Sequence, residues 1–186
     1  MSGGHGHVDP SNKKIALLVA VLAALLAISE MAGKSSQTHG LSSHIDASNL
    51  WSFFQAKTIR QTTMRTAAEG ADAQFKDNPQ SMPAALKAQS EQWRRTAQRY
   101  ESEPETNEGR KELMARAKAK EEFRDRSLAA YHMFEYGSAS FQLAIVLAGA
   151  AALTSVAWLM FISMGLGVVG LGFTLLAFLA PTAIHL

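Results

Sequence analysis

One stretch decides the class of this chain: residues 137–186, GSASFQLAIVLAGAAALTSVAWLMFISMGLGVVGLGFTLLAFLAPTAIHL, contain no Lys, Arg, Asp or Glu. The whole chain of 186 residues holds 18 basic and 16 acidic side chains, and these are dense between positions 34 and 136. A soluble globular protein distributes its charges over a surface that faces water everywhere. A charge-free stretch of this length therefore indicates a lipid environment.

Three apolar runs are long enough to cross a bilayer, which takes roughly 20 helical residues. They are residues 15–32, 141–164 and 166–186, and we expect a turn between the second and third near residues 163–165. Lys13 and Lys14 precede the first run, which could instead be a signal peptide. The segment that follows it, Ala32-Gly33-Lys34, is a poor cleavage site, so three transmembrane helices are predicted.

The polar section, residues 33–140, is predicted to be helical with no sheet, because it lacks alternating runs of Val and Ile. Before the first span, residues 1–14 are typical of a disordered tail. After it, residues 33–40 are interpreted as a polar linker. A capping box at residues 43–46 then predicts a helix that extends to about residue 77.

Two further helices are expected in the polar section. Ser81 is a candidate N-cap for one, with Pro83 in its first turn. A second capping box at residues 102–105 predicts the other, which can continue directly into the second span because no proline interrupts residues 105–180. The section should form an antiparallel, coiled-coil-like arrangement, although its heptads are too irregular for a long coiled coil. The predicted buried sides hold Phe53, Ala56, Arg60, Met64, Ala67, Ala71 and Phe75 on the first helix, Met82, Leu86, Trp93, Ala97 and Tyr100 on the second, and Leu113, Ala117, Leu128, Tyr131 and Phe134 on the third.

Small side chains recur in the predicted spans at a spacing of about four residues, which lets helix backbones approach closely in lipid. They could pack the chain's own helices, or they could form a contact between copies in a homo-oligomer. The residues are Ala16, Ala20 and Ala24 in the first span, Ala144, Ala148 and Ala152 in the second, and Gly165, Gly167, Gly170 and Gly172 in the third.

Glu30 is the one carboxylate in any predicted span. An ionisable group inside a membrane is costly and is often functional. Glu30 lies near the end of its run, however, so a position at headgroup depth is the simpler interpretation. A functional Glu30 would be a proton or cation site, or a partner for a basic residue of another subunit.

Polar and aromatic residues crowd residues 49–61, immediately after the first span. They could form an interfacial aromatic belt with cations that meet lipid phosphates, or an ordinary solvated helix face. The candidates are Asn49, Trp51, Gln55, Lys57 and Arg60.

His132 and Glu135 share a helix face before the second span, which is a spacing that could hold a metal. Two ligands are too few for a site, so no metal is predicted. His39 and His44 would have to join them, and His5, His7 and His185 lie near the chain ends.

Phosphate-binding loops, dinucleotide loops and hydrolase motifs are absent from the sequence, as are cysteines, so neither an enzyme nor a cofactor is predicted. Basic residues alternate with acidic ones and form no basic cluster, which argues against a nucleic-acid partner.

Several segments resemble one bacterial family, the domain of unknown function numbered 4337 (DUF4337). The most specific segment is residues 47–61, Ala-Ser-Asn-Leu-Trp-Ser-Phe-Phe-Gln-Ala-Lys-Thr-Ile-Arg-Gln. Residues 12–18, 29–30, 33–34, 100–103 and 129–132 are similar to the family as well. The resemblance implies a bacterial membrane protein of this layout and implies no activity.

These observations favour a non-enzymatic protein of the bacterial inner membrane that acts as a scaffold or homo-oligomeric assembly, with the lipid bilayer as a partner. The alternative is a channel or transporter component, with Glu30 and the Gly-rich third span near a conduction path; a surface enzyme is a weaker option. Five basic residues lie near span ends on the side of the polar section and two lie before the first span, which favours a cytoplasmic polar section. The five are Lys34, Lys118, Lys120, Arg124 and Arg126, against Lys13 and Lys14.

Overall fold

A computed structural model describes residues 10–183, and every regular element in that range is helical. The order is α1 (Pro10–Gln74), the short 3₁₀ helix η1 (Pro79–Ser81), α2 (Ala84–Glu101), α3 (Arg110–Thr154) and α4 (Ala157–Leu179). These elements form two compact units. We call residues 10–41 with 124–183 the apolar unit, and residues 42–123 the hairpin unit. The all-α prediction is confirmed, as is a long helical section between apolar segments.

The long helix α1 corrects three predictions at once. Residues 10–14, predicted as part of a disordered tail, are helical, whereas residues 1–9 with His5 and His7 lie outside the described range. The predicted linker at residues 33–40 and the predicted helix start at Ser43 are wrong, because the helix is continuous there. Gly33 and Gly40 contact another helix instead of ending this one. A Cβ added at Gly33 would lie 3.1 Å from Cβ of Phe134.

The start of α3 also differs from the prediction. The segment 102–105 does not begin this helix, which starts at Arg110. Ser102 Oγ and the Glu103 N–H donate to the Glu112 carboxylate, at 2.6 and 3.2 Å, so the first turn of α3 fixes the loop before it. From Arg110 the helix then runs to Thr154 without a break at Gly137, as predicted from the absence of proline.

The turn between α3 and α4 lies at residues 155–156, not at residues 163–165. Ser155 adopts a left-handed backbone with φ of 56°, which reverses the chain without glycine. Ser163 lies inside α4, is fully buried, and donates from its hydroxyl to the Ala144 carbonyl at 2.7 Å. The predicted limits of the second and third spans therefore shift toward the N-terminus, and residues 184–186 with His185 lie outside the described range.

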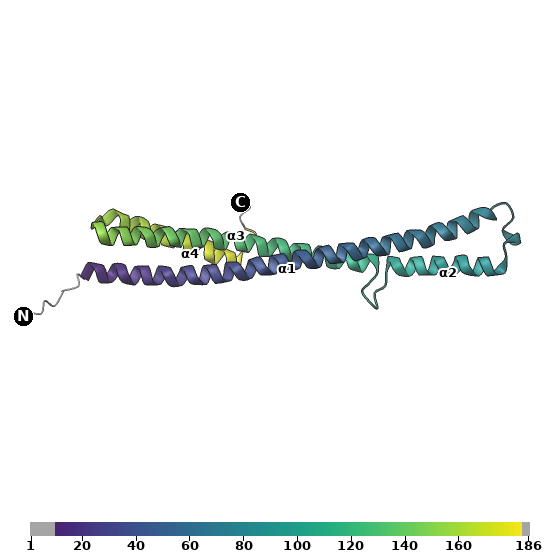
Figure 1. The fold of residues 1–186 in the computed structure, drawn as a ribbon, viewed down its shortest axis with the longest axis horizontal. Helices are drawn as coiled ribbons and strands as arrows, with labels where there is room; N and C mark the ends of the chain where they lie inside the picture. The colour runs from purple at the N-terminus through teal and green to yellow at the C-terminus, as the bar shows by residue number, and fades with distance from the viewer. Residues whose placement is uncertain (1–9, 184–186) are drawn as a thin grey trace, which may run out of the picture. The chain divides into compact units, whose positions relative to one another are not determined.

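Within the apolar unit, α1, α3 and α4 lie side by side (Figure 1). One cluster joins Leu22, Phe141 and Ala144; a second joins Ala130, Met133, Phe134 and Ala177. Between them the backbones of α3 and α4 come close, since a Cβ at Gly170 would lie 2.9 Å from the Phe141 ring. Small side chains are thus required where these helices cross.

Some residues of the predicted small-residue rows are buried and others are exposed. Ala144 and Ala148 are fully buried in the chain's own packing, and Ala152 is half-buried. In α4, Gly167 and Gly170 are buried, whereas Gly165 and Gly172 are exposed. The row Ala16, Ala20 and Ala24 is exposed along its whole length.

Many large hydrophobic side chains of the apolar unit are exposed. Leu153 is 89% exposed, Phe161 73% and Val168 71%. Three helices, α1, α3 and α4, are long and apolar enough to cross a membrane. A surface of this composition is unfavourable in water and suits lipid.

Gly170→Val should lower the thermal stability of the protein in detergent, because the new Cβ meets the Phe141 ring. Overpacking of this kind costs about 1–3 kcal/mol. The matched control is Gly172→Val in the same helix, where a Cβ meets nothing within 4 Å. Circular dichroism melting of both variants measures the effect; equal midpoints would show that the α3–α4 crossing is not tightly packed.

Candidate functional site: a polar junction in the hairpin unit

The buried side of α1 in the hairpin unit holds polar residues that hydrophobic periodicity did not select. The predicted stripe contained Ala56, Arg60 and Ala67. The structure buries the next residue in each case, namely Lys57, Gln61 and Ala68, and Arg60 is exposed. The buried side of α1 is thus shifted toward Lys57, Gln61 and Ala68, while Ala71 of the predicted stripe is buried as predicted.

Lys57 shows why a charged residue can occupy that position. Its side chain is only 7% exposed, and its ammonium lies 3.5 Å from Glu103 and 3.9 Å from Glu108. The same nitrogen lies 5.5 Å from the centre of the Phe53 ring and 5.3 Å from that of Tyr100. A buried ammonium is tolerated only with such partners. Lys57 therefore ties α1 to the loop that follows α2.

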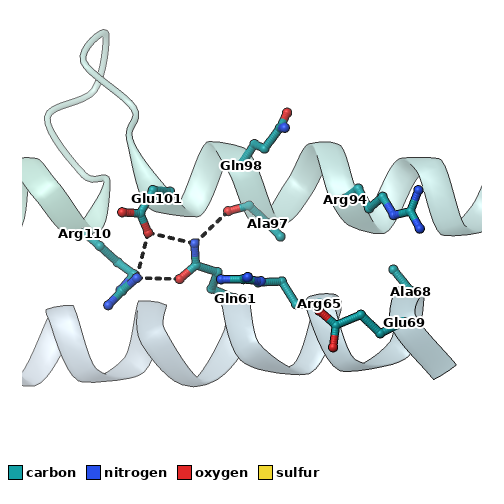
Figure 2. A pocket seen from close by; sticks show the side chains of 9 residues that line it. All are labelled: Gln61, Arg65, Ala68, Glu69, Arg94, Ala97, Gln98, Glu101 and Arg110. Carbon is teal, nitrogen blue, oxygen red and sulfur yellow. Dashed lines mark hydrogen bonds and ion pairs between the residues drawn. The ribbon is translucent and has the colours of Figure 1, made fainter.

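Arg110, the first residue of α3, completes the junction (Figure 2). Its Nη1 donates to Glu101 at 2.7 Å and to Gln61 Oε1 at 2.6 Å, and its Nε donates to Thr58 at 2.9 Å. The guanidinium also lies 5.0 Å from the centre of the Phe54 ring. One side chain thus connects the start of α3 with α1 and with the end of α2.

Gln61 is satisfied on both sides of its amide. Its oxygen accepts from Arg110, while Nε2 donates to the Ala97 carbonyl at 3.2 Å and to Glu101 at 2.9 Å. The hydrogen bond from Gln61, and then the charge of Arg110, hold the pKa of the Glu101 carboxyl below its usual value. Glu101 therefore stays ionised at neutral pH and keeps the network charged.

A groove of about 550 Å³ opens beside this junction between α1 and α2 (Figure 2). Of its three arginines, Arg110 is bound to Glu101 and Arg94 pairs with Asp72. None of its nine lining residues is a Ser, Thr, Cys, His, Lys or Tyr. The polar groups of the junction hold helices together, and the groove walls offer no hydroxyl or thiol nucleophile. The lining residues are Gln61, Arg65, Ala68, Glu69, Arg94, Ala97, Gln98, Glu101 and Arg110.

The remaining predicted residues of the segment 49–61 have different surroundings. Trp51 Nε1 donates to Glu121 at 2.9 Å, and its ring packs edge-on against Phe54, so this aromatic contributes to contacts within the hairpin unit. Asn49 and Gln55 are exposed. The sequence analysis did not select Glu101 or Arg110. Their positions at the two ends of the loop between α2 and α3 were the available signal, because the side chains that flank a chain reversal often hold it in place.

The other candidates belong to the apolar unit. Nε2 of Gln142 donates to the Glu30 carboxylate at 3.1 Å. His132 and Glu135 are 3.3 Å apart and exposed, and Tyr131 donates to Glu135 at 2.6 Å. Within residues 10–183, no group of three or more His, Asp or Glu side chains is arranged to hold a metal ion.

These features define a class: an all-helical protein with three helices that are long and apolar enough to cross a membrane, and a polar hairpin held by paired charges. The chain belongs to the family described as domain of unknown function DUF4337, which matches residues 11–180. No curated protein and no solved structure matches it.

Lys57→Ala should destabilise the hairpin unit, because it removes both ion pairs and both ring contacts of a buried ammonium. We expect a fall of about 5–10 °C in the thermal midpoint. Arg60→Ala, one turn away and exposed, is the control and should change the midpoint by about 1 °C. If both variants have the same thermal midpoint, Lys57 does not hold the loop in place.

Proposed function

We propose that this protein is a non-enzymatic scaffold of a membrane that assembles with further copies of itself through the outward face of α1. The main support is the composition of that face in the hairpin unit. Ile45 is 52% exposed and Ile59 is 68% exposed, while Ser48 and Ser52 between them are small and uncharged. Covering a large aliphatic side chain is favourable by about 25 cal/mol for each Å² of apolar surface removed from water.

The apolar part of α1 supports the same proposal. Ala16, Ala20, Ala23 and Ala27 are all exposed and follow a spacing of four, three and four residues. That spacing places them on one helix face, and alanine allows a second helix to approach closely in lipid. The face from Ile45 to Ile59 has comparable intervals of three, four and seven residues. A parallel pair of α1 helices is the simplest contact, because a membrane holds both copies in one orientation.

Cysteine substitution tests this contact cleanly, because the chain contains no cysteine. In membranes treated with a mild oxidant, Ile45→Cys should form a disulfide-linked dimer, because equivalent residues meet in a parallel pair. The control is Arg65→Cys, which lies on the side of α1 that lines the groove with α2. Equal dimer formation by both variants, or none by either, would contradict assembly through this face.

We further propose a bacterial inner-membrane location with the hairpin unit in the cytoplasm. The family resemblance supports the first part, and the five-to-two excess of basic residues on the side of the spans that carries the hairpin unit supports the second. Gln89 is an exposed position for a labelling probe, whereas its neighbour Ser90 is buried and donates to Asp72.

Gln89→Cys should resist a membrane-impermeant maleimide in intact cells and react after permeabilisation, because the reagent reaches only the outer side. Labelling compared by gel shift provides the measurement. Reaction in intact cells would reverse the proposed orientation.

A further inference from the structure

The apolar unit contains a groove of about 620 Å³ between α1 and α3, at the level where apolar helix surface gives way to charged residues. Its lining includes two carboxylates, Glu30 and Glu135, and one ammonium, Lys34. No predicted role accounts for this combination. On α1, Glu30 and Lys34 follow Ala27 at intervals of three and four residues, so the groove borders the face used for the proposed assembly.

The charged groups of the groove retain binding capacity. Gln142 is the hydrogen-bond partner of Glu30, and this contact occupies one carboxylate oxygen. Glu135 accepts from Tyr131 and lies beside His132, and it is exposed. Among residues 10–183, Lys34 has no ion-pair partner within 4.0 Å. Both Glu135 oxygens therefore have one partner each, whereas the groove offers the second oxygen of Glu30 and the Lys34 ammonium for further contacts.

The groove continues onto an apolar surface. Ala139 lines it beside Phe134, and the same face of α3 proceeds to Leu143 and Val146, which are 57% and 66% exposed. These residues follow Glu135 at intervals of four, four and three, so they share one helix face. A ligand that fits this surface has a charged end and a hydrocarbon chain.

The charge pattern selects among such ligands. Two carboxylates against one lysine repel an anionic headgroup, whereas the three N–H donors of a primary ammonium match carboxylate acceptors. Lys34 then suits a phosphate beside that ammonium. A bare metal ion fits poorly, because the described residues 10–183 gather no three acidic or imidazole ligands. We propose that the groove binds a zwitterionic lipid with a primary ammonium, of the phosphatidylethanolamine type: ammonium at Glu30 and Glu135, phosphate at Lys34, and an acyl chain along Ala139 to Val146.

Native mass spectrometry of the purified full chain tests the site, with phosphatidylethanolamine, phosphatidylcholine and phosphatidylglycerol of identical acyl chains as probes. The wild type should retain phosphatidylethanolamine most strongly, since methylation removes the N–H donors of choline and glycerol carries no cation. The double variant Glu30→Gln, Glu135→Gln should weaken phosphatidylethanolamine binding by about tenfold and abolish the preference. Lys34→Gln should weaken it by less, about threefold.

The matched control is Glu122→Gln, an exposed carboxylate of α3 in the hairpin unit, which should leave lipid binding unchanged. Circular dichroism confirms that each variant is folded, and exposed Glu→Gln changes preserve shape. Equal retention of the three lipids, or full binding by the double variant, would overturn the proposal. Competition by free phosphoethanolamine as strong as that by the lipid would also overturn it, because the hydrocarbon surface would then contribute nothing.

Discussion

The backbone's need for internal hydrogen bonds in lipid constrains this protein more than any single contact. A segment without water must satisfy its N–H and C=O groups within itself, and a helix does so. Proline is absent from residues 11–78 and 105–180, so nothing forces those helices to stop at the limits of the apolar segments. Both α1 and α3 accordingly extend from the apolar unit into the hairpin unit as single helices.

The same demand explains how polar side chains are placed in the apolar unit. Ser29, Ser163 and Thr174 are buried, and each hydroxyl donates to a backbone carbonyl, namely those of Phe134, Ala144 and Gly170. Two of these bonds connect different helices. A buried hydroxyl without a partner is unfavourable, so these contacts help to fix which helix faces meet. Glycines at the α3–α4 crossing then bring the backbones close enough for them to form.

Stability in the hairpin unit has a different origin. Its buried apolar side chains are mostly small, with Ala47, Ala68, Ala97, Leu113 and Ala117 among them. Such side chains remove little surface from water, so the charged and amide groups around Lys57, Gln61 and Arg110 carry much of the specificity. The DUF4337 segment at residues 47–61 supplies most of the α1 side of this junction. Its aromatic residues serve the hairpin as partners for cations and for Glu121.

The sequence by itself determined the helical class, the three apolar segments and the uninterrupted passage of the third polar helix into the second span, because composition and the absence of proline act locally. It also indicated the buried face of α2, where Ala97 is buried and Leu86, Trp93 and Tyr100 are partly buried. It did not determine where helices end. Gly33, Gly40 and the Ser43 cap are local stop signals, and contacts with Phe134 and Leu128 override them. The turn at Ser155 depends on a backbone angle that no local residue preference demands. The burial of two polar residues of α1 was decided by tertiary structure: Lys57 and Gln61 are polar by type, and only the distant Glu101, Glu103 and Arg110 make their burial favourable.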